Sequence, residues 1–142
     1  MMEDINELKS RTALDTTIVP INSIFTLFDL PIENEERLQE FESHLTKEKN
    51  LNDVIDEISK IGGKNVQEFV KRTMSRIISN EVGSQYSWIG LKQKKNFSKL
   101  LVVQAIIRAG LILFKNENSK SFEESIKNWL RRSKERLDKQ KK

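Results

Sequence analysis

The sequence predicts an all-α fold, a compact bundle of about five helices that follows an extended N-terminal lead-in. Apolar residues recur every three or four positions in five separate stretches, and residues suited to helix ends lie between those stretches. No stretch shows the alternation of apolar and polar residues that is typical of strands, so we expect no β-sheet. At 142 residues the chain is long enough for one domain with a hydrophobic core.

The N-terminal part has little periodicity. Residues 1–24 are expected to form a flexible arm or an arm that docks on the domain, because Pro20 prevents a helix through the apolar residues around it. The apolar segment from Phe25 to Ile32 contains Pro31, so we expect it to be extended and packed. We assign the single helical domain to residues 25–138 and a basic tail to residues 139–142.

Two helices are expected next. The first begins after Asn34, a residue suited to the N-cap, and has two glutamates in its first turn. The second runs from about Leu51 to Lys60. The pair Gly62-Gly63 ends it, because glycine accepts the left-handed conformation that closes a helix. The first helix has an inward apolar stripe of Leu38, Phe41 and Leu45.

Three further helices are expected in the second half. The third begins after the cap Asn65, and its pattern is broken at residues 80–83. The fourth, from about Asn96 to Lys115, is apolar around much of its circumference and should be the central, most buried element. The fifth begins at a capping box formed by Ser121 and Glu124. Its inward stripe consists of Phe122, Ile126, Trp129, Leu130 and Leu137.

Charge is distributed unevenly along the chain, whose net charge is +4. Residues 1–63 hold 14 acidic and 6 basic residues, a net charge of −8, whereas residues 64–142 hold 7 acidic and 19 basic residues, a net charge of +12. Such asymmetry indicates either that one half contacts a polyanion or that the halves attract each other. Two solvated surfaces of opposite sign are the simpler alternative.

The first candidate site is a basic turn. Lys92, Lys94 and Lys95 follow Trp88 closely and precede the fourth helix, where they could contact phosphates while the turn packs on the core. The alternative is a solvated linker whose lysines keep the surface soluble.

The second candidate site is the last helix, on which cations flank both sides of the apolar stripe. Such a helix can lie in a major groove or along a phosphate backbone. It can equally spread its long side chains around its own core face. One flank contains Lys127, Arg131 and Lys134, and the other contains Arg132, Arg136 and Lys139.

The aromatic residues near the turn allow two interpretations. Tyr86 and Trp88 could stack on unpaired bases, as in proteins that bind single strands. We expect instead that Trp88 and Trp129 are core residues. Neither His44 nor the glutamates of the first predicted helix form a catalytic or metal-binding pattern, and we expect these residues to face solvent. The glutamates concerned are Glu35, Glu36, Glu40 and Glu42.

Several ordered motifs together resemble the family catalogued as domain of unknown function 4806, which is abundant in insect proteins, including ones that look derived from transposons. The resemblance covers about residues 28–137 and implies a C-terminal module of larger nuclear or mobile-element proteins, with no catalytic residues to transfer. The chain departs from the family at two places. Ile89 stands where the family usually has a small or polar residue, and the Gly-Lys pair often found near Lys94 is absent. The motifs are Phe28-Asp29-Leu30-Pro31-Ile32, residues 38–45, Ile61-Gly62-Gly63, Asn80-Glu81, Tyr86-Ser87-Trp88, Gly90, Lys95, Phe97 and residues 126–132. The helical layout and basic last helix also bear a fainter resemblance to the BEN domain, an all-helical DNA-binding module.

The leading functional hypothesis is a non-enzymatic module that binds DNA, or alternatively RNA, through its basic half. The second hypothesis is a protein-interaction or self-association module that pairs acidic and basic halves. We expect no cofactor, no metal and no membrane partner. The absence of cysteine fits a reducing compartment, and the acidic N-terminus is unlike a signal peptide. We therefore expect an intracellular location, in the nucleus rather than the cytoplasm. The predicted nucleic-acid contacts are Lys92, Lys94, Lys95, Lys127, Arg131, Arg132, Lys134 and Arg136.

Overall fold

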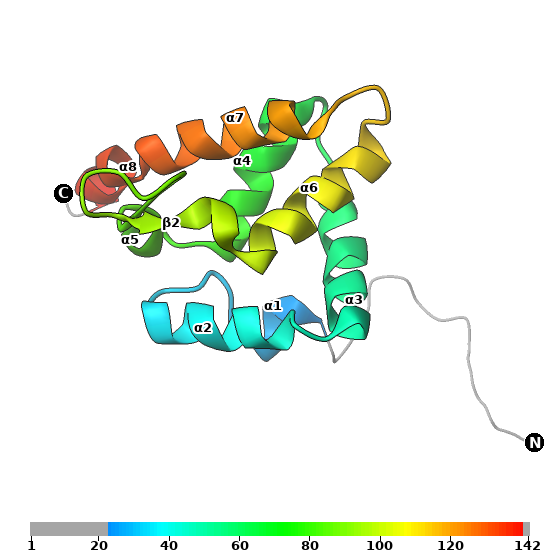
Figure 1. The fold of residues 1–142 in the computed structure, drawn as a ribbon, viewed down its shortest axis with the longest axis horizontal. Helices are drawn as coiled ribbons and strands as arrows, with labels where there is room; N and C mark the ends of the chain where they lie inside the picture. The colour runs from blue at the N-terminus through cyan, green and yellow to red at the C-terminus, as the bar shows by residue number, and fades with distance from the viewer. Residues whose placement is uncertain (1–22, 141–142) are drawn as a thin grey trace, which may run out of the picture.

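The computed structural model describes residues 23–140 and has an all-α architecture, as predicted (Figure 1). Residues 1–22 and 141–142, which include most of the expected N-terminal arm and the end of the expected basic tail, lie outside the described residues. The elements are α1 (Ile24–Leu27), α2 (Glu35–His44), α3 (Glu48–Ser59), α4 (Val66–Ile77), α5 (Asn80–Gly83), β1 (Tyr86–Ser87), β2 (Lys95–Asn96), η2 (Phe97–Lys99), α6 (Leu101–Leu113), α7 (Ser119–Arg131) and α8 (Ser133–Gln140).

Local capping signals place α2, α3 and α4 close to where the sequence predicts them. The Asn34 side chain accepts a hydrogen bond from the Arg37 N–H at the start of α2, and Asn65 accepts one from the Glu68 N–H at the start of α4. Gly62 follows α3 with a φ of +67°, the left-handed conformation expected there. Helix α3 begins at Glu48, three residues before the predicted start.

The prediction of an extended segment from Phe25 to Ile32 is wrong at its beginning, because Ile24–Leu27 form α1. The carboxylate of Glu57, on α3, accepts hydrogen bonds from Ser23 Oγ at 2.7 Å and from the Ile24 N–H at 3.0 Å. A distant side chain therefore stabilises the first turn of this helix. At the other end of the segment, Ile32 is extended and forms an isolated parallel bridge with Ile78.

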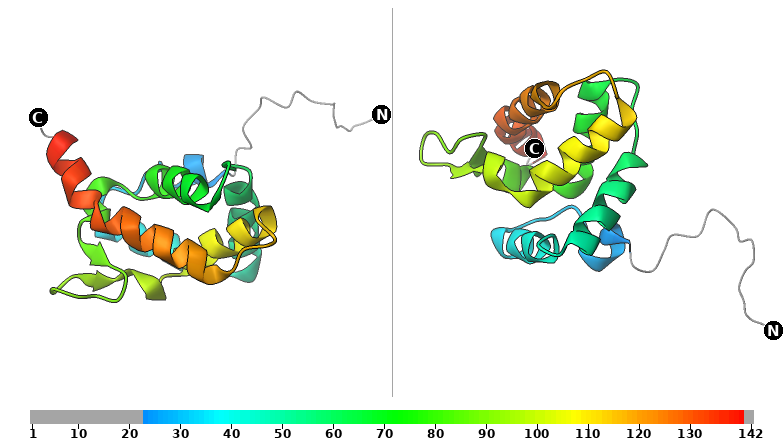
Figure 2. Two further views of the ribbon diagram at one scale, coloured as in Figure 1. Left: turned by 90° about the horizontal axis from the view of Figure 1, so that it is seen from above. Right: turned by 45° about the vertical axis from the view of Figure 1, so that its right-hand side comes forward.

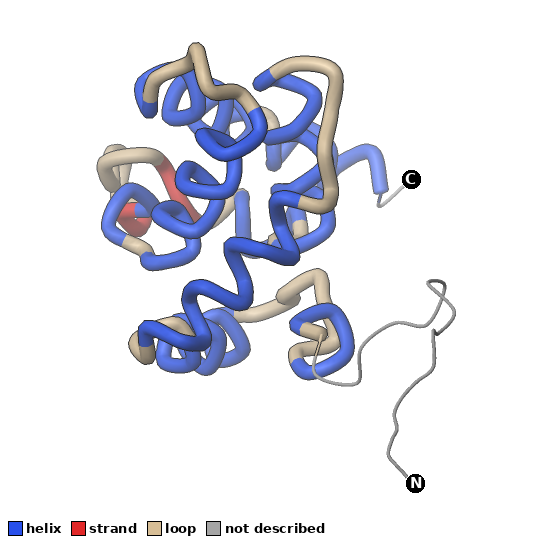
Figure 3. The backbone as a smooth tube through the Cα atoms, turned by 90° about the vertical axis from the view of Figure 1, so that its right-hand side faces the viewer, coloured by secondary structure: helices blue, strands red, loops and turns tan. Residues whose placement is uncertain are grey.

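The region between α4 and α6 has more structure than predicted. Residues 80–83, expected to be a break, form α5, whose N-cap is Ser79. The predicted helix from Asn96 to Lys115 begins later, at Leu101, because residues 95–99 form β2 and the short helix η2. The strands β1 and β2 pair in parallel over two residues each, so the expectation of no sheet is wrong at this one place; Figure 3 shows them as a short red segment among helices.

The fifth predicted helix is divided in two. Its N-cap is Asn118, whose side chain accepts from the Ser121 N–H at 3.2 Å, so the predicted capping box at Ser121 is wrong. Residue Arg132 separates α7 from α8. Near this break the carbonyl of Trp129 accepts hydrogen bonds from Ser133 Oγ and from Arg136, which satisfies a carbonyl group at the end of α7.

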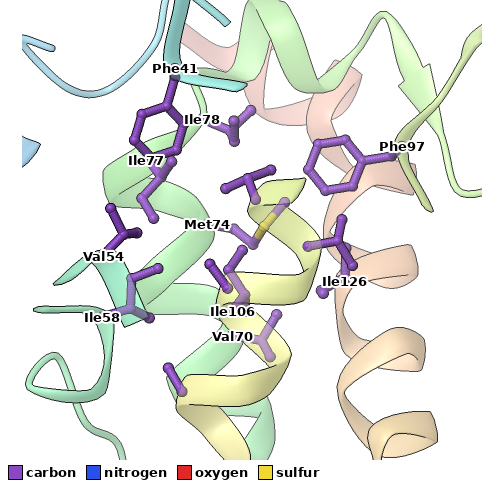
Figure 4. Packing of buried hydrophobic residues seen from close by; sticks show 14 of the residues in the cluster. Phe41, Val54, Ile58, Val70, Met74, Ile77, Ile78, Phe97, Ile106 and Ile126 are labelled. Atoms are coloured by element: carbon purple, nitrogen blue, oxygen red, sulfur yellow. The ribbon is translucent and has the colours of Figure 1, made fainter. Parts of the chain in front are cut away.

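The core lies among α3, α4, α6 and α7, and α6 packs between α3 and α7 (Figure 1). Figure 4 shows Val70 and Met74 of α4 close to Ile106 of α6 and Ile126 of α7, and all four are buried. The close packing of α6 on α7 requires a glycine, because a Cβ at Gly110 would collide with the Phe122 ring. The predicted central position of the fourth helix is thus confirmed, but α6 is not more buried than α4, since its last residues Ile112 and Leu113 are exposed.

Candidate nucleic-acid interface

The predicted basic turn is a tightly bonded loop that connects β1 to β2 and projects from the helices (Figure 2). The Lys94 N–H donates to the Leu91 carbonyl at 3.0 Å, which closes a turn in which Lys92 and Gln93 both have left-handed φ angles of 58° and 64°. Such angles are uncommon for residues other than glycine and cost of order 1–2 kcal/mol each.

Three further hydrogen bonds hold this loop on the body of the protein. The Leu91 N–H donates to Ser87 Oγ at 2.7 Å, the Lys95 N–H to the Gln85 carbonyl at 3.0 Å, and the Ser98 N–H to the Trp88 carbonyl at 2.9 Å. Gly90 has a φ of +81°, which glycine adopts without strain. These hydrogen bonds fix the path of the loop and therefore the positions from which its lysines extend.

An open pocket of about 440 Å³ lies between this loop and α7. Its apolar lining includes the two exposed side chains Ile89 and Leu91, which are 58% and 59% exposed. We call this cavity the apolar pocket. The lining residues are Tyr86, Ser87, Trp88, Ile89, Leu91, Lys92, Lys94, Lys127, Leu130 and Arg131.

The apolar pocket brings together four of the cations that the sequence analysis selected. Lys92 and Lys94 come from the loop, whereas Lys127 and Arg131 lie one turn apart on α7. Lys127 also forms an exposed ion pair with Glu124 at 3.3 Å. Within residues 23–140, no acidic side chain lines the pocket, so the cations meet at a site of positive potential.

A groove between α4 and α7 contributes further cations. It is lined by the cations Lys71, Arg132 and Arg136, together with Gln67, Ser75, Ser125, Asn128 and Trp129. We call it the α4–α7 groove. A small hollow lined by Asn128, Arg131 and Arg132 lies between the α4–α7 groove and the apolar pocket. Arg131 lines both the hollow and the apolar pocket, and Arg132 lines both the hollow and the groove. No carboxylate of the described chain lines any of the three.

Lys95 occupies a different position from the other two lysines of the loop. Its Nζ forms an ion pair with Glu35 Oε1 at 3.1 Å and lies 5.8 Å from the centre of the Tyr86 ring. The Tyr86 hydroxyl donates to the same Glu35 oxygen at 2.8 Å. These bonds attach the loop to α2, and within residues 23–140 the half-exposed Lys95 ammonium is paired with a carboxylate, unlike those of Lys92 and Lys94.

The same contacts shift two pKa values. Burial raises the pKa of Tyr86, and its hydrogen bond to Glu35 raises it further because the carboxylate disfavours a second negative charge. Burial also acts to raise the pKa of Glu35, but hydrogen bonds from Gln39, Tyr86 and Lys95 outweigh it and hold that pKa below its ordinary value. Glu35 is thus a charged anchor for the loop at neutral pH.

The predicted contacts on α8 separate from those on α7. The Arg136 guanidinium lies 4.1 Å above the Trp129 ring and donates to Asn80 Oδ1, to the Trp129 carbonyl and to Ser133 Oγ, each at 2.9 Å. Arg136 therefore holds α8 against α5 and α7. Lys134 is exposed on α8 and lines neither the apolar pocket nor the α4–α7 groove.

The two tryptophans have different environments. Trp129 is 6% exposed and donates a hydrogen bond from Nε1 to Ser75 Oγ at 3.4 Å, so its prediction as a core residue is confirmed. Trp88 is only partly buried; it packs against the core and also lines the apolar pocket. The prediction of a core position for Trp88 is therefore only half right. Sequence reasoning missed Ile89, Leu91, Leu130 and Lys71 as lining residues; two bulky apolar residues beside a glycine in a basic turn were the available signal.

The expectation that the glutamates of α2 face solvent is wrong for two of them. Glu35 anchors the loop, and Glu42 accepts hydrogen bonds from the N–H groups of Leu101 and Val102 at 2.7 and 2.8 Å. These groups begin α6, whose own N-cap residue provides no side-chain bond. Burial raises the pKa of Glu42, although the two N–H groups oppose this shift by favouring the carboxylate.

The described part of the chain contains neither a metal-binding cluster nor a helix that could span a membrane. Within residues 23–140, no three His, Asp or Glu side chains gather in a way that could hold a metal ion. His44 packs edge-on against Phe28, with ring centres 5.1 Å apart. None of the helices in that part of the chain is long and apolar enough to cross a bilayer.

Comparisons with known proteins identify the family. The model of the family described as "Domain of unknown function (DUF4806)" matches residues 25–109, which include the β1–β2 loop and most of α6. Helix α7 and the last of the resembling motifs, residues 126–132, lie beyond the matched range. No curated protein and no solved structure matches the chain, and the fainter likeness to the BEN domain is not supported. The chain belongs to the DUF4806 family.

Proposed function

We propose that this chain is a non-enzymatic nucleic-acid-binding module, with DNA as the expected partner, and that Lys92, Lys94, Lys127 and Arg131 contact phosphates. The observation that carries the proposal is the meeting of these four cations, from two segments distant in sequence, around one pocket without a carboxylate in its lining. Backbone phosphates supply most of the affinity in nonspecific nucleic-acid binding. Three of the four cations, Lys92, Lys94 and Arg131, form no ion pair within residues 23–140, whereas Lys127 is paired with Glu124.

The continuation of the basic surface also supports a polymeric ligand. Arg131 and Arg132 connect the apolar pocket to the α4–α7 groove, where Lys71 adds a further cation. A single small anion would occupy only one of these places. A strand with regularly spaced phosphates can contact all of them in turn.

The test is the salt dependence of binding to labelled DNA, measured by fluorescence anisotropy. Two variants, Lys92→Ala/Lys94→Ala and Lys127→Ala/Arg131→Ala, each remove two charges. Each should weaken binding and reduce the slope of log affinity against log salt by about two, since one phosphate contact contributes roughly one unit. RNA of the same sequence forms a parallel arm.

The matched control removes two charges elsewhere in the basic half. Lys115 and Lys120 are exposed near the connection of α6 to α7 and line neither the apolar pocket nor the α4–α7 groove. The variant Lys115→Ala/Lys120→Ala should bind nearly as the wild type does. If the wild-type chain does not bind nucleic acid at low salt, or if all three variants bind alike, the proposal is wrong.

The second candidate function is self-association, in which the acidic face of one copy meets the basic face of another. Exposed glutamates on α2, Glu36 and Glu40, provide the acidic partner surface that it requires. Light scattering across a salt series tests it, because an assembly held by opposite charges dissociates as salt rises.

A further inference from the structure

We infer that the apolar pocket holds an unpaired nucleobase, so that the preferred ligand is a single strand rather than a duplex. This inference rests on the proposed function and specifies which form of nucleic acid the same site takes. Its basis is the combination of an exposed apolar floor with a rim of cations.

A duplex would leave the apolar lining of the pocket, which we call the floor, without a contact. Ile89 and Leu91 are more than half exposed, and Trp88 and Leu130 lie beside them in the lining. In a duplex the bases are stacked and paired, and the surface offered to a protein consists largely of phosphate and sugar. An unpaired base can instead leave its stack and bury its faces against aromatic and apolar side chains.

The rim and the volume suit one nucleotide within a strand. The pocket encloses about 440 Å³, within the range of roughly 300–1,000 Å³ typical of sites for small organic groups. Lys92 and Lys94 lie on the loop, opposite Lys127 and Arg131 on α7. A base between them would place its flanking phosphates near cations on both sides.

The loop is already arranged for such a ligand. Its turn is closed by the bond from the Lys94 N–H to the Leu91 carbonyl, and its position is fixed by the bonds of Leu91 to Ser87 and of Ser98 to Trp88. A preformed loop loses little conformational freedom on binding. The lining offers few uncharged polar groups. They are the Ser87 hydroxyl, the Trp88 indole N–H and the Tyr86 hydroxyl, which is bonded to Glu35, so we expect little preference among bases.

The test compares a short oligothymidylate strand with the duplex that it forms with its complement, using the full chain and fluorescence anisotropy. The variant Ile89→Ser/Leu91→Ser removes the exposed floor without changing the charge. It should weaken binding of the single strand roughly ten-fold or more, the effect expected from losing one stacked or buried base, with an unchanged salt slope. Duplex binding should not change.

The matched control is Ile112→Ser/Leu113→Ser, because these residues are also exposed and apolar but lie at the end of α6. It should bind the single strand as the wild type does. Wild-type tryptophan fluorescence should be quenched by the single strand. Trp88→Leu should abolish most of that quenching, since Trp129, although it lines the α4–α7 groove, is only 6% exposed.

Three outcomes would overturn the inference. Equal binding of strand and duplex, with no effect of Ile89→Ser/Leu91→Ser, would leave phosphate contact as the whole interaction and the proposed function intact. No binding of either form would reject the proposed function as well. Tighter, floor-dependent binding of an acidic tryptophan-containing peptide than of the strand would assign the pocket to a protein partner.

Discussion

The acidic helices α2 and α3 and the basic region formed by the β1–β2 loop and α7 use their charges in opposite ways. On the acidic side, three carboxylates bind other parts of the fold: Glu35 holds the loop, Glu42 caps α6 and Glu57 caps α1. On the basic side, Lys92, Lys94 and Arg131 form no ion pair with any carboxylate of residues 23–140. A net charge therefore says little about a surface until the partners of each charge are known.

Glu42 is the strongest test of the difference between the two regions, because its carboxylate accepts hydrogen bonds from the first two N–H groups of the central helix α6. Glu42→Ala would leave those groups without a partner, including the N–H of the buried Val102, and should lower the free energy of unfolding by about 2 kcal/mol. Urea denaturation measures this. Glu40→Ala, on the exposed face of the same helix, should cost less than about 0.5 kcal/mol. If Glu42→Ala costs no more than Glu40→Ala, the acidic half is only a solvated surface.

Two arginines test the same distinction inside the basic half. Arg136→Ala removes three hydrogen bonds and the stacking on Trp129, so it should lower the free energy of unfolding by about 1–2 kcal/mol. Arg136 also lines the α4–α7 groove, but its guanidinium is bonded within the fold, so its loss should weaken nucleic-acid binding less than the loss of Arg131 does. Arg131→Ala should have the reverse effects, with stability within about 0.5 kcal/mol of the wild type. Thermal denaturation measures the stability of both variants, and fluorescence anisotropy measures their nucleic-acid affinity. A stable Arg136→Ala variant that has lost binding would contradict a structural role for Arg136.

The smallest expected effect concerns the strain in the loop. Lys92→Gly relieves a left-handed conformation and should raise the stability by up to about 1 kcal/mol while weakening nucleic-acid binding. Gln93→Gly is the matched control, since it relieves a similar conformation but keeps the charge, and its affinity should stay at the wild-type level. Parallel denaturation and binding curves provide the measurement. Reduced stability in both variants would show that these angles are not strained in this loop.

Much of the fold could be predicted from local pattern. The caps Asn34 and Asn65 and the closing Gly62 act on backbone groups only a few residues away, so the sequence places them directly. Two errors occur where a distant group contributes. Glu57 bonds the first turn of α1 beside the local cap Ser23, and Glu42 accepts hydrogen bonds from the first N–H groups of α6. The errors at α5 and at the start of α7 instead concern local caps, Ser79 and Asn118, that the sequence-based predictions overlooked.

The candidate site shows the same limit. The sequence was sufficient to select Lys92, Lys94, Lys127 and Arg131 as cations of interest, because charge and helical spacing can be read along the chain. It did not separate them from Lys95 and Arg136, which have the same charge but are bonded to Glu35 and to Trp129, respectively.

The sequence by itself thus determined the helical class, most helix positions and the basic character of the second half, because all three follow from interactions between residues close in the chain. Only the tertiary structure decided which charges are paired within the fold and which are not. It also placed Trp88, Ile89 and Leu91 across from α7, which creates the apolar pocket. The physical reason is that burial and charge pairing depend on contacts between segments far apart in sequence, and no local spacing encodes those contacts.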